Sequence, residues 1–93
     1  MTTPANPKHS FVYDGARLNV YHVNKGEGLP KHEHQWSHLT MCNAGSCYVK
    51  KHGKQILLTK DSLPVDLPAN EWHEIEALED DTVFVNVFAE GKY

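Results

Sequence analysis

Apolar and polar residues along the chain alternate with the two-residue period of β-strands. The alternation is most regular near the C-terminal end, where His73, Ile75 and Ala77 share one face. Apolar residues never recur at spacings of three and four over a dozen positions, as an amphipathic helix requires. Segment 82–89 is nearly all apolar, broken only by Asn86, and is predicted to be a central strand. The pattern predicts strands at 10–13, 17–23, 36–42, 47–51, 54–59, 71–78 and 82–89.

Turn residues separate these segments. Asp14-Gly15 is a strong signal for a two-residue hairpin turn. Pro64 and Pro68 restrict 60–70 to an edge or irregular strand, because proline cannot donate a hydrogen bond to a neighbouring strand. About eight short strands separated by turns indicate an all-β sandwich or barrel. Further turns or loops are predicted at 24–30, 43–46 and 52–53.

Length and charge narrow the class of protein. A chain of 93 residues has room for one domain. Nine basic and twelve acidic side chains give a net charge of -3, and no basic cluster is longer than Lys50-Lys51, so nucleic acid is excluded as an expected partner. The N-terminus lacks the apolar run of a signal peptide, and no segment approaches a membrane span. We therefore expect a cytoplasmic protein with no membrane partner.

The two cysteines, Cys42 and Cys47, flank a predicted turn. A cross-strand disulfide is one possibility there. In a reducing cytosol we favour two buried or half-buried thiols. A structural zinc site that uses these cysteines is a further alternative, but their spacing is not the close Cys-x-x-Cys that such sites favour.

Seven histidines are the one compositional excess, and four of them have the spacing of a metal site. His32 and His34 are two apart, so on an extended backbone both rings project from one face. His38 is four residues after His34, so its ring projects from the same face if the strand continues without interruption. His73 lies on the inward face of its own strand, where a closed barrel can bring it opposite the other three. These four histidines are therefore the predicted metal ligands, because buried neutral imidazoles without a metal or hydrogen bond are costly.

The remaining histidines, His9, His22 and His52, lack such a pattern. A single histidine on a strand is more often a surface residue or one with an ordinary hydrogen bond than a ligand. We assign these three to that class.

The histidine pattern resembles the first motif of the cupin superfamily, which runs Gly, five residues, His-x-His, three or four residues, Glu, six residues, Gly. Gly26, His32, His34, His38 and Gly45 follow its spacing, with His38 in place of the Glu.

The second cupin motif is matched in part. Its proline and histidine correspond to Pro68 and His73, whereas Ser62, Asn70 and Ala77 depart from it. Asn70 in place of a glycine is tolerable, because asparagine is the next-best residue for a left-handed turn. Both motifs with their spacer cover about half of the chain.

This resemblance implies a six- to eight-stranded, jelly-roll-like antiparallel β-barrel with a divalent metal inside, often paired as a homodimer through its edge strands. It implies a single cupin domain over 1–93, with 1–9 as a flexible or edge-pairing arm. It does not imply one reaction, because cupins include dioxygenases, decarboxylases, isomerases, lyases and binding modules.

The replacement of Glu by His38 changes the expected chemistry. Four neutral imidazoles leave the full charge of a divalent ion to be shared with water and substrate, which favours an anionic or oxygen-rich small molecule. Mn, Fe, Ni or Zn fits such a site, as a Lewis acid or an oxygen-activating centre. No catalytic acid or base is assigned from the sequence. An enzyme is the first hypothesis, and a non-catalytic metal-dependent binding or sensing module is the second.

Overall fold

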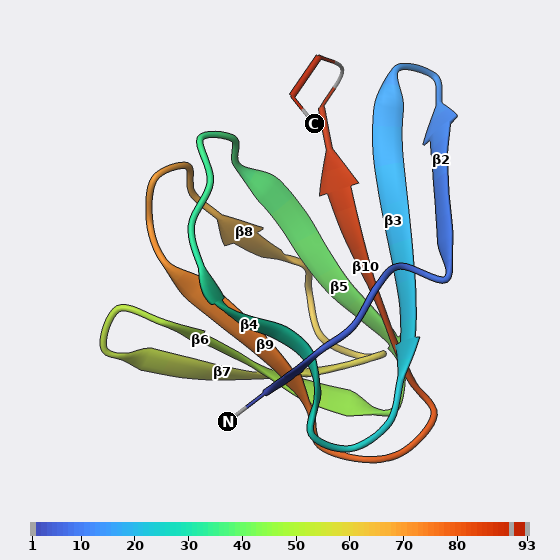
Figure 1. Cartoon of the computed structure of the whole chain (residues 1–93), viewed down its shortest axis with the longest axis vertical. Coiled ribbons are helices and arrows are strands. Elements are labelled where there is room, and N and C mark those ends of the chain that lie inside the picture. Colours follow the sequence, from blue (N-terminus) through green and yellow to red (C-terminus); the bar gives the residue numbers. More distant parts are fainter. Residues whose placement is uncertain (1, 90, 93) are drawn as a thin grey trace.

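Ten strands form two five-stranded sheets in the part of the chain that this computed structural model describes, residues 2–89 and 91–92 (Figure 1). The all-β, jelly-roll prediction is confirmed. The first sheet has the order β1 (Thr3–Pro4), β4 (Glu27–His32), β9 (His73–Ala77), β6 (Ser46–Lys51) and β7 (Lys54–Thr59). The second has the order β2 (His9–Tyr13), β3 (Ala16–Val23), β10 (Thr82–Phe88), β5 (His38–Ala44) and β8 (Val65–Leu67).

Most strands and turns lie where the sequence pattern predicts them. Strands β2 and β3 pair around Asp14 and Gly15, whose positive φ values of 50° and 83° suit a two-residue hairpin turn. Strand β10 is central, with β3 on one side and β5 on the other. The proline-bounded β8 is an edge strand, as predicted. No helix in the described residues is long and apolar enough to cross a membrane.

The prediction of a loop at 24–30 is wrong, because β4 begins at Glu27. Glycine and proline disfavour a strand locally, but Gly28 and Leu29 pair with β9, and β1 adds a parallel pairing at the sheet edge. A Cβ on Gly28 would lie 2.1 Å from the Ile75 carbonyl oxygen, so the glycine permits the close approach of the two strands. The predicted N-terminal arm, residues 1–9, pairs with the edge of the first sheet through Thr3–Pro4. Met1 lies outside the described residues.

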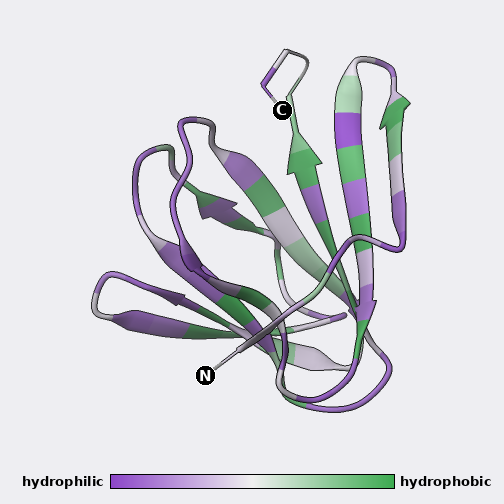
Figure 2. Ribbon diagram, in the orientation of Figure 1, coloured by the Kyte–Doolittle hydropathy of each residue, from purple (hydrophilic) through white to green (hydrophobic). Residues whose placement is uncertain are grey.

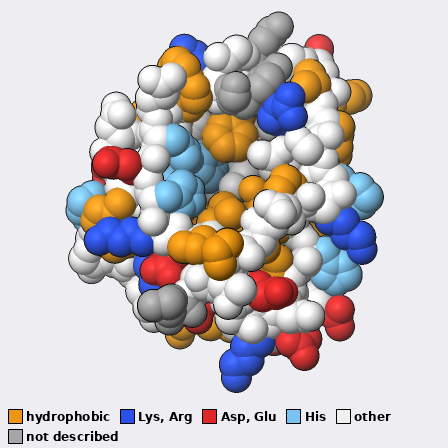
Figure 3. Space-filling view, in the orientation of Figure 1, with side chains coloured by type: hydrophobic (Ala, Val, Ile, Leu, Met, Phe, Trp, Pro, Cys, Tyr) orange, Lys and Arg blue, Asp and Glu red, His pale blue; other side chains and the backbone are white. Residues whose placement is uncertain are grey.

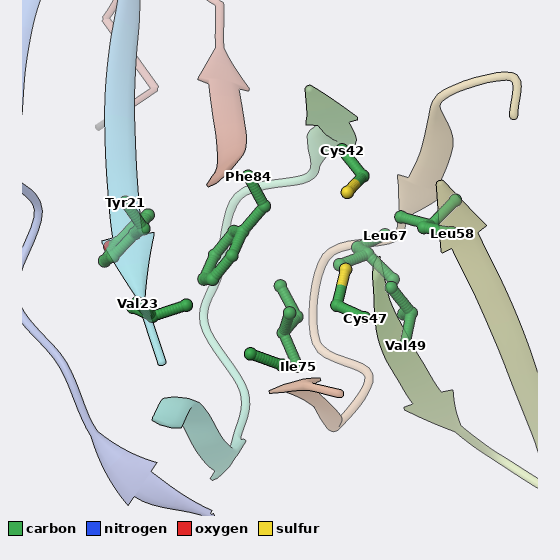
Figure 4. Close-up of a cluster of buried hydrophobic side chains, with 10 residues drawn as sticks. Tyr21, Val23, Cys42, Cys47, Val49, Leu58, Leu67, Ile75 and Phe84 are labelled. Carbon is green, nitrogen blue, oxygen red and sulfur yellow. The ribbon is translucent and has the colours of Figure 1, made fainter. Parts of the chain in front are cut away.

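The inner faces of the two sheets form one apolar core (Figures 2 and 4). The Tyr21 and Phe84 rings stack at 4.6 Å between centroids. Cys42 and Cys47 lie in this core as free thiols, so the thiol alternative is confirmed over the disulfide. Burial raises the pKa of Cys47 to about 12, and a neutral thiol is a poor metal ligand.

Gly45 marks the point where the chain leaves β5 in the second sheet and enters β6 in the first. It has φ +70°, and a Cβ there would lie 2.4 Å from the Thr82 hydroxyl oxygen. Gly53 has a similar φ of +63° with nothing within 4 Å of its Cβ position. Any other residue at either position would therefore strain the backbone, but only a side chain at position 45 would also clash with a neighbour.

We expect Gly45→Ala to lower the free energy of unfolding by roughly 1–3 kcal/mol more than Gly53→Ala, which carries the backbone cost alone. Urea denaturation of both variants measures the difference. Equal losses would show that the contact with Thr82 relaxes without cost.

Candidate metal centre

The four predicted histidines come from four separate parts of the fold. His32 ends β4, His34 lies in the connection that follows, His38 begins β5 and His73 begins β9. The continuous strand on which the shared parity of His38 depended is therefore not present. The strand stops at His32 because the chain there crosses from the first sheet to the second, and this crossing places His38 on the opposite wall of the sandwich.

The crossing nevertheless brings the four rings together. His32, His34 and His73 have ring nitrogens within 4.8 Å of one another, a cluster that could hold one metal ion. His38 lies beside this group, with its ring centroid 5.1 Å from that of His34 and 5.2 Å from that of His73. His32 and His73 are paired across β4 and β9, which fixes the distant ligand against the local ones.

Backbone carbonyls fix the tautomers of the two half-buried rings. Nδ1 of His32 donates to the Pro30 carbonyl oxygen at 2.6 Å, and Nδ1 of His34 donates to the Trp36 carbonyl oxygen at 2.6 Å. A carbonyl oxygen only accepts, so each Nδ1 must carry the hydrogen. Nε2 of each ring is left with a free lone pair, which is the form that binds a metal.

The other two rings are buried and incompletely hydrogen-bonded. His73 is 1% exposed and His38 is 3% exposed. Within the described residues, both ring nitrogens of His73 and Nε2 of His38 are buried without a hydrogen bond of ordinary geometry, although the Glu71 backbone lies close enough to His73 to oppose in part the lowering of its pKa. Burial lowers the pKa of His73 to about 3 and that of His38 to about 4, and the neighbouring histidines reinforce both shifts. Both rings are therefore neutral at pH 7.

Neutral imidazoles with unused buried lone pairs fit a transition metal, because nitrogen ligands suit Mn, Fe, Ni and Zn and the ion would coordinate the one lone pair that each ring offers. Zinc ligation by the cysteines is disfavoured, since both thiols lie in the apolar core. The donor set of this site is imidazole.

The three histidines assigned to ordinary roles lie outside the cluster. His22 Nε2 is 3.2 Å from an Asp81 carboxylate oxygen, and the His52 ring lies 5.2 Å from that of Trp72. His9 is exposed on the edge strand β2.

Solved structures provide a comparison for this arrangement. A cupin superfamily protein from Desulfitobacterium hafniense is similar with a TM-score of 0.73 at 14% identity, over 92% of this chain and 82% of that one. A cupin 2 domain-containing protein from Halorhodospira halophila gives 0.77 at 17% identity, over 91% and 64% of the two chains. A cupin protein from Bacteroides fragilis gives 0.67 at 17%, over 94% and 86%. The chain has the cupin fold.

The likeness is one of structure: no family model matches the sequence, and no curated protein is significantly similar to it. At such low identities the solved structures establish the fold alone. The chemistry of this cupin site must be argued from its own residues.

A backbone hydrogen bond joins the segment that corresponds to the second cupin motif to the segment that corresponds to the first. Asn70 has φ 63°, so asparagine does take the left-handed conformation expected where the motif has glycine. Its backbone N–H donates to the His34 carbonyl oxygen at 2.8 Å. This bond holds the turn before His73 against the loop that carries His34.

Two residues beside the cluster were not assigned from the sequence. The Phe88 ring lies 4.7 Å from the His38 ring and 5.9 Å from the His34 ring, between centroids. Asp66 lines, with Phe88 and His38, a pocket of about 280 Å³ at the end of the second sheet. Nothing in the local sequence marks Asp66, because only the pairing of β8 with β5 brings it there.

Histidine side chains also reach the molecular surface, in a hollow between the two sheets that apolar side chains border (Figure 3). This agrees with the partial exposure of His32 and His34. The cluster is therefore accessible from one side and closed by His38 and His73 on the other.

Tyr13 and Tyr21, whose hydroxyls could transfer protons, lie away from the histidine cluster. Tyr21 is stacked in the core, and Tyr13 is 74% exposed on β2. Lys51 donates to the Asp66 backbone oxygen at 3.4 Å. None of the described residues is assigned as a general acid or base.

The lowered pKa values predict an acid-sensitive metal-free protein. An unfolded histidine has a pKa of about 6.5, so between pH 6.5 and about 3 the unfolded chain binds more protons than the folded one at His38 and His73. The free energy of unfolding should therefore fall as pH is lowered through this window, by several kcal/mol from these two groups, because each unit by which a pKa is lowered corresponds to about 1.4 kcal/mol.

Urea denaturation of metal-free protein at pH 6.5 and pH 4 tests this. His73→Gln should show a smaller loss than the wild type, whereas His9→Gln, an exposed control, should match it. An unchanged loss in His73→Gln would contradict the assignment of the acid sensitivity to the buried cluster.

Proposed function

We propose that the protein is a metal-dependent cupin in which His32, His34, His38 and His73 hold one divalent transition metal, Mn, Fe, Ni or Zn, for use on a small anionic or oxygen-rich molecule. One observation carries this proposal: the four rings converge, and three of their buried nitrogens have no hydrogen bond within the described residues. Orphaned buried polar atoms are costly, and a bound ion would satisfy two of the three, Nε2 of His38 and one ring nitrogen of His73.

The charge of the site supports the ligand class. A divalent ion among four neutral imidazoles keeps its full charge, so it would attract a carboxylate or an enolate-like oxygen more strongly than a site with a glutamate ligand. When bound, the ion would supply Lewis acidity or activate oxygen.

The protein's own residues orient and enclose the site. The Pro30 and Trp36 carbonyls hold the His32 and His34 rings with Nε2 lone pairs available. The Phe88 ring packs on His34 and His38, and its apolar face would exclude water from that side. The hollow in Figure 3 would admit the small molecule.

A non-catalytic binding or sensing module is the second candidate. It is favoured by the lining of the adjacent pocket, which apart from His38 is apolar except for Ser37 and the exposed Asp66. An enzyme that moves protons would need one of these, or a group of the substrate itself, as acid or base. Turnover that is lost in Asp66→Asn would show an enzyme that uses Asp66, whereas metal-dependent ligand binding without turnover in the wild type would favour the binding module.

We also propose that the protein is a cytoplasmic homodimer. Strand β2 is an edge strand, and its Phe11, Val12 and Tyr13 side chains are 47%, 51% and 74% exposed. An unprotected apolar edge invites pairing with a second copy. Free thiols in the core are compatible with a reducing compartment.

Metal titration tests the proposed site. We expect one Co²⁺, Ni²⁺ or Zn²⁺ per chain, and a gain in the free energy of unfolding of about 2.7 kcal/mol when the free metal is at 100 times its Kd. A chelator should reverse the gain. His34→Ala and His73→Ala should lose it, because each removes a ligand.

His22→Ala provides the matched control, since His22 lies outside the cluster and contacts Asp81. It should bind metal like the wild type. Equal thermal stability with and without chelator, together with no metal uptake, would overturn the proposed function.

Ligand binding separates a working site from a merely structural one. We expect oxalate, a bidentate dicarboxylate, to change the absorption spectrum of the Co²⁺-loaded protein and to bind at least tenfold more weakly without metal. If oxalate leaves the spectrum unchanged, the ion has no open position for substrate, and its role is structural.

A further inference from the structure

A chain of three buried polar residues leads from the middle of β10 to the metal cluster. Asn86 is 2% exposed, Thr40 is 0% exposed and His38 is 3% exposed. Asn86 and Thr40 are direct partners across β10 and β5, and both project inward. Asn86 is the one polar residue inside an otherwise apolar central strand, apart from Thr82 at its start.

The hydrogen bonds of this chain run in one direction. The Thr40 hydroxyl donates its single hydrogen to Asn86 Oδ1 at 2.7 Å. The Thr40 oxygen is also 3.2 Å from His38 Nδ1, and with its hydrogen already used it can only accept there. His38 Nδ1 must therefore be the donor.

A second contact leads to the same conclusion. His38 Nδ1 lies 3.4 Å from the Leu39 carbonyl oxygen, which also can only accept. Both neighbours of Nδ1 thus require a hydrogen on it. Nε2, which is buried and without a partner, keeps its lone pair.

We propose that Asn86 and Thr40 are positioning residues for the metal site: they hold His38, whose ring lies beside those of His34 and His73, in the tautomer that keeps the lone pair on the buried Nε2, and so make it the fourth ligand. This inference rests on the proposed function. Thr40 and Asn86 do for His38 what the Pro30 and Trp36 carbonyls do for His32 and His34. His38 occupies the position where the cupin motif has glutamate, whose carboxylate needs no tautomer to be selected. The change of ligand therefore creates the need for this support.

The decisive variant is Thr40→Val, which keeps the shape of the side chain and removes the hydroxyl. We expect it to weaken Co²⁺ binding about tenfold or more, the usual effect of losing a residue that supports a ligand. Thr40→Ser retains the hydroxyl and should restore binding close to that of the wild type. Thr82→Val is the matched control, because Thr82 is equally buried and donates its hydrogen to the Glu79 carbonyl oxygen at 2.7 Å, and none of its hydrogen bonds in the described part of the chain reaches a histidine.

A readout without metal comes from the ring-nitrogen chemical shifts of His38 in ¹⁵N-labelled protein, assigned by their loss in His38→Gln. The wild type should show a hydrogen on Nδ1 and a lone pair on Nε2. Asn86→Leu frees the Thr40 hydroxyl at 3.2 Å to donate to Nδ1 in competition with the longer contact to the Leu39 carbonyl at 3.4 Å, so the population with the hydrogen on Nε2 should rise and Co²⁺ affinity should fall. Unfolded variants are recognised by their amide spectra.

The outcomes separate the two proposals. If the wild type binds no metal, the proposed function fails, and the tautomer measurement alone decides whether the hydrogen-bond chain acts as described. If the wild type binds metal but Thr40→Val binds it equally well, or if folded Asn86→Leu keeps the wild-type tautomer, the positioning role is overturned. A loss of affinity in Thr82→Val as large as that in Thr40→Val would also overturn it, because general destabilisation would then account for both.

Discussion

Imidazole nitrogens buried without hydrogen bonds between two β-sheets are the constraint on which the rest of this structure depends. Each buried polar group left unpaired costs about 1–3 kcal/mol, a considerable part of the stability of a small domain. The described structure has three such nitrogens, all in His38 and His73. Their cost is tolerable in a fold with a tight apolar core, and a bound cation would turn it into a favourable interaction.

The jelly roll is well suited to create this cluster. The short connection after β4 crosses between the sheets, so His32 and His38 lie on opposite walls although they are close in sequence. Strand β9 supplies His73 through direct pairing with His32. The Asn70–His34 backbone bond closes the arrangement. The ligands are thus fixed by strand pairing and crossover.

Local sequence patterns predicted the parts of the fold that depend on local chemistry. The Asp14-Gly15 turn, the inward face of β9 and the apolar β10 follow from side-chain type and two-residue alternation. Strand β4 could not be predicted, because its glycine and proline disfavour a strand and only pairing with β9 and β1 establishes it. The four histidines were identified by spacing, but on the assumption of a single continuous strand that the structure does not have.

The residues that support the site could not be identified from the spacing of residues along the sequence. Asn86 was visible as a polar residue in an apolar strand, and Thr40 as a neighbour of His38, yet their contact depends on the register between β10 and β5. Phe88 and Asp66 reach the cluster through tertiary packing, which has no signature in a single sequence.

X-ray absorption spectroscopy of the metal-loaded protein tests the central claim most directly, because imidazole ligands are recognised by scattering from their rings. Four imidazole nitrogens around one ion, at about 2.0–2.1 Å if it is zinc, are the predicted result. An ion bound mainly by oxygen or sulfur, or by fewer than three imidazoles, would contradict the account.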